Sequence, residues 1–171
     1  IFPGFLTSLV YTKDISDTEL LASAGFTIAH EISHGFDYSG AQLDAYGSPS
    51  PVFADEDVDK FTDKTSALAA YYSNIELKPG VKVDGQNVVS EANADLAGMQ
   101  AVLQIAAEDE DFDYNEFFSC VAKEYAQVMT EDDFAYYAAD IHPMGNLRTN
   151  VNVQMFDTIY DKFDITAGDG L

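Results

Sequence analysis

His30-Glu31-Ile32-Ser33-His34 is the stretch of the sequence with the strongest structural signal. In an α-helix, residues four apart lie on one face, one turn from each other. Both imidazoles can therefore bind a single metal ion, while Glu31 points toward the water that such an ion carries. Zinc is the usual ion for this pattern, with the glutamate as general base of a peptide hydrolase. A chance match in a chain of this size is expected roughly once in a few hundred sequences. The presence of a third ligand elsewhere in the chain would therefore distinguish a metal site from a chance match.

Length and composition indicate a folded, strongly acidic protein. The 171 residues are 47% hydrophobic and suffice for one domain or one large lobe with a sizeable core. The formal net charge of −22 argues against nucleic acid as a partner, because its phosphates would be repelled, and against anionic membrane surfaces. No apolar run approaches the length of a membrane span. Because Cys120 is the single cysteine, an intrachain disulfide is excluded.

Helix signals dominate the chain. Ser16 and Glu19 have the spacing of a capping box, and the proline-free apolar segment that follows predicts a buried helix over 17–36. Further elements are expected as helices over 55–74, 90–107, 115–129, 130–139 and 154–163, a small hairpin around 81–83, and an extended or irregular opening segment over 1–10. The sequence therefore predicts a mainly α fold with a few short strands, forming a single domain over 1–171.

A catalytic zinc ion takes three protein ligands and keeps one position open for water. One short-spacer pattern requires glycine three residues and histidine six residues after the second histidine, but Asp37 and Gly40 stand there. Another requires glutamate 19 or 20 residues after it, where the chain has Phe53 and Ala54. The only further histidine is His142, so the third ligand is a carboxylate if that histidine has another role.

Glu91 is the best candidate for that carboxylate. It lies 57 residues after His34, at the expected start of its own helix, and Asp95 follows four residues later. This spacing places both acids on one helix face, where Glu91 can bind the metal and Asp95 can accept the outer N–H of a ligand imidazole. The alternative is that such a pair forms an ordinary solvated face. Asp37 is a further candidate for an acid beside a ligand histidine, and a loop-start cap is an equal alternative.

Three blocks of the sequence resemble the neprilysin family of zinc metallopeptidases, and they occur in the family's order. They are His-Glu-Ile-Ser-His-Gly-Phe-Asp at 30–37, Glu-Ala-Asn-Ala-Asp at 91–95, and His-Pro-Met-Gly-Asn-Leu-Arg at 142–148. The opening Ile-Phe-Pro at 1–3 is similar to the family's segment just upstream of the zinc helix. The family includes neprilysin, endothelin-converting enzyme and bacterial endopeptidase O. The resemblance covers nearly the whole chain and implies the catalytic lobe, with a His-Glu-x-x-His helix and a second ligand helix.

The resemblance also implies a role for each matching residue. His30, His34 and Glu91 would bind one zinc ion, Glu31 would be the general base, and Asp95 would orient a ligand histidine. Zinc lowers the pKa of its water toward about 7 and acts as a Lewis acid on the scissile carbonyl.

Two residues of the third block would act on the substrate. His142 would stabilise the oxyanion of the tetrahedral intermediate, a contribution of roughly 2.7–4 kcal/mol for one well-placed donor. Arg148 would hold a substrate carbonyl or carboxylate through its planar fork. The chain departs from the family in lacking the large helical lobe that closes over the cleft, the substrate-docking strand ahead of Ile1, and a tryptophan near the end.

These expectations define two hypotheses about function. The first is a zinc-dependent endopeptidase or oligopeptidase acting on small peptides, and the alternative is a zinc-binding but inactive fragment or interaction module, because part of the substrate cleft is missing. An inert helical domain with a chance motif would bind no zinc at all. For localisation, a cytoplasmic bacterial oligopeptidase is favoured over an exported enzyme, and the sequence predicts no particular oligomeric state.

Overall fold

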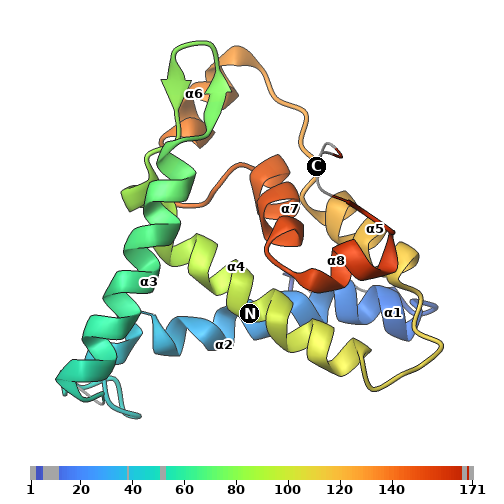
Figure 1. The fold of residues 1–171 in the computed structure, drawn as a ribbon, viewed down its shortest axis with the longest axis horizontal. Helices are drawn as coiled ribbons and strands as arrows, with labels where there is room; N and C mark the ends of the chain where they lie inside the picture. Colours follow the sequence, from blue (N-terminus) through green and yellow to red (C-terminus); the bar gives the residue numbers. More distant parts are fainter. Residues whose placement is uncertain (1–2, 6–11, 38, 51–52, 167–168, 170–171) are drawn as a thin grey trace. The chain divides into compact units, whose positions relative to one another are not determined.

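The computed structural model describes residues 3–5, 12–37, 39–50, 53–166 and 169, so most of the opening segment predicted over 1–10 lies outside the described residues. In the described part of the chain, helices predominate and two short strands form one hairpin (Figure 1). The prediction of a mainly α fold with a few short strands is confirmed. None of the helices described is long and apolar enough to cross a membrane.

Two compact units make up the chain. Unit 1 consists of Ile1–His30, Asp95–Val128 and Gly145–Leu171, and unit 2 consists of Glu31–Ala94 and Met129–Met144. The divisions fall within α2 (Phe26–Ser33) and α4 (Gly85–Ala106), so each of these helices contributes residues to both units. The single domain expected over 1–171 stays a prediction.

The predicted helix over 17–36 is helical throughout, but its hydrogen bonding changes along its length. A capping box between Ser16 and Glu19 starts α1 (Asp17–Leu20), as the sequence predicts. A π-helical turn, η2 (Leu21–Gly25), separates α1 from α2, and a 3₁₀ turn, η3 (His34–Phe36), follows α2. The motif histidines therefore lie on one helical run, His30 within α2 and His34 at the start of η3.

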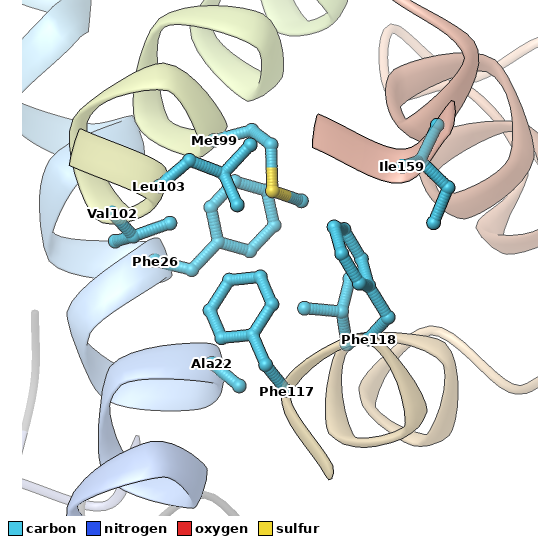
Figure 2. Close-up of a cluster of buried hydrophobic side chains, with 9 residues drawn as sticks. Ala22, Phe26, Met99, Val102, Leu103, Phe117, Phe118 and Ile159 are labelled. Carbon is cyan, nitrogen blue, oxygen red and sulfur yellow. The ribbon is translucent and has the colours of Figure 1, made fainter. Parts of the chain in front are cut away.

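Unit 1 has its own hydrophobic core. The helix α5 (Tyr114–Glu124) packs against α1 and η2, and α7 (Gly145–Gln154) packs against α5 and α8 (Asp157–Lys162) (Figure 1). Figure 2 shows the buried side chains that η2, α2, α4, α5 and α8 bring together: Ala22, Phe26, Met99, Val102, Leu103, Phe117, Phe118 and Ile159. The rings of Phe117 and Phe118 meet edge to face, with centroids 5.2 Å apart, the arrangement that aromatic quadrupoles favour. This core fixes the segment of α2 that ends at His30.

Unit 2 contains α3 (Asp55–Ser73), the antiparallel strands β1 (Glu76–Lys78) and β2 (Val81–Lys82), and α6 (Glu131–Ala138). The hairpin lies beside α6 (Figure 1), because Lys78 binds Glu131 at 2.8 Å and its ammonium stands 4.0 Å from the centre of the Phe134 ring. Gly80 has a φ of 80° in the connecting turn, a conformation that glycine adopts without strain.

Several predicted helix limits are wrong, and local capping explains the differences. The helix predicted over 90–107 begins at Gly85, because the Asp84 carboxylate accepts the Asn87 N–H at 3.2 Å and caps it. The helix predicted over 115–129 ends at Glu124, and the helix predicted over 154–163 covers Asp157–Lys162. The sequence analysis missed α7 altogether, since its asparagines and threonine are poor helix formers; burial of Leu147 and Val151 stabilises it.

Removing the Phe117 ring should destabilise unit 1. Its side chain is fully buried at the centre of the aromatic cluster, so Phe117→Ala is expected to lower the free energy of unfolding by about 3–5 kcal/mol in urea denaturation. Val128 is fully exposed, and Val128→Ala should change that free energy by less than about 0.5 kcal/mol. A Phe117→Ala loss as small as that of the control would contradict the assignment of this cluster as the core.

Candidate metal centre

Three side chains form a cluster suited to a metal ion. One ligand atom from each of His30, His34 and Glu91 lies within 4.8 Å of the other two. His30 and Glu91 are buried, with 4% and 8% of their surface exposed, and His34 is half-buried. These are the three residues that the sequence analysis selected as ligands, so the structure brings that set together.

His30 is held by an acid on the neighbouring helix. Its Nδ1 lies 2.9 Å from Oδ1 of Asp95, which is completely buried on α4. The helices approach closely here, because a Cβ on Gly98 would lie 2.9 Å from the His30 backbone nitrogen. A hydrogen bond at Nδ1 fixes the ring orientation and makes Nε2 the atom presented to a metal.

His34 has an equivalent partner within unit 2. Its Nδ1 lies 2.9 Å from Oδ2 of Asp37, which also accepts the Ser90 hydroxyl at 2.7 Å. The other oxygen of Asp37 accepts the backbone N–H groups of Ser39 and Gly40 at 2.9 and 2.8 Å. Both alternatives raised for Asp37 therefore hold, since it bonds the histidine and caps the loop. Burial raises the pKa of Asp37, but the hydrogen bonds from Gly40, Ser90, His34 and Ser39 outweigh it and hold that pKa below its usual range.

Glu91 stands between two histidines of unit 2. Its Oε1 is 3.6 Å from Nε2 of His34, and its Oε2 is 3.2 Å from Nε2 of His142. The other ring nitrogen of His142 bonds Oδ1 of Asp140 at 2.7 Å, and the same oxygen accepts the His142 backbone N–H. That backbone hydrogen bond, followed by the one from the ring, lowers the pKa of Asp140. The aspartate thus fixes His142 with Nε2 facing Glu91.

The donor set fits zinc. Two imidazole nitrogens and one carboxylate oxygen are a set found in catalytic zinc sites. Ligands at about 2.0–2.2 Å from a tetrahedral ion lie roughly 3.3–3.6 Å apart, which agrees with the 3.6 Å between His34 and Glu91. Histidines that bind zinc usually hydrogen-bond a carboxylate or carbonyl through the ring nitrogen that does not face the metal, and both histidines do so here through Nδ1.

The remaining predicted residues have distinct settings. Glu31 follows His30 on α2 and its side chain is exposed. Arg148 of α7 donates from Nε and Nη2 to the two oxygens of Asp95, at 2.9 and 2.5 Å. Its guanidinium also lies 4.5 Å from the centre of the Tyr125 ring. Asp95 therefore binds both the His30 ring and, through two hydrogen bonds, the Arg148 guanidinium.

Three residues of these networks were missed in the sequence: Asp140, Ser90 and Tyr125. Asp140 lies two residues before His142, a spacing at which an aspartate readily bonds a following backbone N–H, so that signal was available. Ser90 bonds Asp37 across 53 positions of sequence, and Tyr125 meets Arg148 through tertiary packing. No local pattern marks either contact.

Comparisons with known proteins agree with this geometry. The family model described as peptidase family M13 matches residues 1–171. Neutral endopeptidase of Lactococcus lactis subsp. cremoris is 32% identical over 171 residues, which cover 99% of this chain and 27% of that protein. Endothelin-converting enzyme 1 of Mus musculus is 29% identical over 102 residues, covering 59% of this chain and 13% of that protein.

Solved structures show the same fold. The Mycobacterium tuberculosis zinc metalloprotease Zmp1, crystallised with an inhibitor, matches with a TM-score of 0.84 and 24% identity, over 95% of this chain and 27% of that one. The chain thus spans about a quarter of the length of the relatives it matches. The predicted neprilysin-family resemblance and the zinc-peptidase fold class are confirmed. Because the family model matches the chain from end to end, this protein belongs to peptidase family M13.

Proposed function

We propose that residues 1–171 form a single catalytic domain that binds one zinc ion and hydrolyses peptide bonds of small peptides. The observation that carries this proposal is the cluster of His30, His34 and Glu91 with a carboxylate on Nδ1 of each histidine. The relatives named neutral endopeptidase and endothelin-converting enzyme support a peptide substrate. Zinc bound there would lower the pKa of water toward about 7 and polarise the scissile carbonyl.

The chain's own residues would supply the remaining steps. Glu31, exposed beside His30, would accept the proton of the attacking water as general base. His142, fixed by Asp140, would donate from Nε2 to the oxyanion of the tetrahedral intermediate. Arg148, held on the Asp95 carboxylate, would bind a substrate carbonyl or carboxylate, while Asp95 and Asp37 would keep the two ligand rings oriented.

The second candidate is a zinc-binding protein without turnover. It is favoured by one observation, namely that the chain covers only 27% of the Lactococcus neutral endopeptidase. Substrate contacts made by the rest of such relatives could be required for hydrolysis. The two candidates agree on zinc and differ on peptide cleavage.

Glu31→Gln separates these candidates. We expect the wild type to cleave a mixed quenched-fluorescent peptide pool, and Glu31→Gln to lose that cleavage while keeping a stoichiometric zinc content, because the amide cannot take the proton. Chelation should abolish wild-type cleavage and added zinc should restore it.

Three outcomes of that assay would decide against the first candidate. Stoichiometric zinc in both proteins with no wild-type cleavage above Glu31→Gln would favour the non-catalytic candidate. Equal cleavage by both proteins would contradict Glu31 as base, and a chain that never binds zinc would contradict both candidates.

Asp95→Asn tests the orientation of His30. The amide keeps the shape of the side chain but removes the charge beside Nδ1, so zinc affinity should fall by about 10–100-fold in a chelator competition titration. Asp59→Asn, on the exposed surface of α3, is the control and should leave affinity unchanged. Unchanged affinity in Asp95→Asn would show that Asp95 does not tune the metal site.

His142→Ala tests the oxyanion role. Since its proposed partner forms mainly in the transition state, kcat should fall by about 10²–10³-fold with little change in KM. Steady-state kinetics at one pH, with zinc content checked, give both constants. A variant whose KM rises while kcat is preserved would instead assign His142 to ground-state binding.

A further inference from the structure

Glu124, the last residue of α5, has an unusual setting for a carboxyl group. Its Oε1 accepts the Thr27 hydroxyl of α2 at 3.2 Å. Its Oε2 is buried and has no hydrogen-bond partner among the residues that the structure describes. A buried carboxylate oxygen without a partner is costly, so this arrangement favours either protonation of the acid or a nearby cation that can bind it.

Two charged groups of unit 1 act on this carboxyl, Arg148 of α7 and Asp95 of α4. Burial raises the pKa of Glu124 to about 7, with Asp95 adding to the rise, while the Thr27 hydrogen bond and the Arg148 charge oppose it. Glu116 and Lys123 of α5 itself, and Glu19 of α1, which packs against α5, act instead on the Cys120 thiol. Arg148 is therefore the one cation among the groups that shift Glu124.

Arg148 lies at the same end of α5. Its guanidinium is 4.5 Å from the centre of the ring of Tyr125, the residue directly after Glu124. It is also bidentate on Asp95, whose Oδ1 bonds Nδ1 of His30. A guanidinium has five donors in a fixed plane, so a second carboxylate nearby changes how those donors are divided.

We propose that Glu124 is a positioning residue for Arg148, whose carboxyl group competes with Asp95 for the guanidinium when it is ionised. In the protonated form Arg148 stays bidentate on Asp95, as the structure shows it. In the ionised form the unpartnered Oε2 draws guanidinium donors toward α5. The protonation state of Glu124 thus determines which way the Arg148 guanidinium points and how fully it neutralises the Asp95 carboxylate.

The titration of the two side chains tests this directly, without zinc or substrate. In the metal-free full chain, carboxyl ¹³C shifts of Glu124 and the ¹⁵Nε shift of Arg148 are followed by NMR from pH 5 to 9. We expect Arg148 to show a transition with the same midpoint as the Glu124 carboxyl, near 7. Glu124→Gln is isosteric and neutral, and should abolish the Arg148 transition.

Glu116→Gln, on the same helix, is the matched control and should retain it. The control matters because a histidine titrating through Asp95 could also move the Arg148 resonance; such a transition would persist in Glu124→Gln and would overturn the proposal. A Glu124 carboxyl that titrates without any change at Arg148 would overturn it equally.

The effect on catalysis additionally depends on the proposed function of Arg148. If Arg148 binds substrate, KM of the wild type should change with pH around the Glu124 midpoint, whereas KM of Glu124→Gln should lack that change. Absence of peptide cleavage in the wild type would refute the proposed function, and the NMR titration would still decide the role of Glu124. A wild-type KM that varies with pH identically in Glu124→Gln would overturn the positioning role.

Discussion

The pairing of each ligand histidine with a buried carboxylate is the constraint on which this site depends. Asp95 and Asp37 each hold an Nδ1 atom at 2.9 Å, so both rings are oriented by the protein itself. A flexible imidazole would lose rotamer freedom on binding a metal, whereas these two have lost it already in folding. This orientation would lower the entropic cost of binding a metal ion at the candidate centre.

The two carboxylates are stabilised in different ways. The charge of Asp37 is stabilised by hydrogen bonds from neutral groups, namely two backbone N–H groups and the Ser90 hydroxyl. Asp95 is fully buried and is neutralised by a whole charge, because Arg148 binds both of its oxygens. A buried carboxylate with no such partner would favour its neutral form. The arginine therefore stabilises the ionised form of the carboxylate that holds His30.

Much of this arrangement follows from local sequence signals. The spacing of His30 and His34 on one helix, the acids of α4 at i and i+4, and the capping box at Ser16 are short-range features, and the structure has all of them. The helix α7 and the Ser90–Asp37 bond were not predictable in this way. The helix α7 forms because burial of Leu147 and Val151 outweighs the poor helix propensity of its sequence. The Ser90–Asp37 bond joins residues 53 positions apart. Tertiary packing determines both.

The π-helical turn at Leu21–Gly25 has a consequence for how this helix can change in length. A π turn holds one residue more than the α-helical hydrogen-bond pattern, and here the Phe26 N–H reaches back to the Leu21 carbonyl. Deleting one residue of this turn would convert it to regular α-helix without breaking the helical run. The segment α1 would then keep nearly the same rotational register relative to the motif histidines, because the wider turn accommodates the extra residue within a single turn. The π turn thus allows the helix to differ in length by one residue while α1 and the histidines keep their relative orientation, and single-residue gaps between related sequences are expected to fall in this turn.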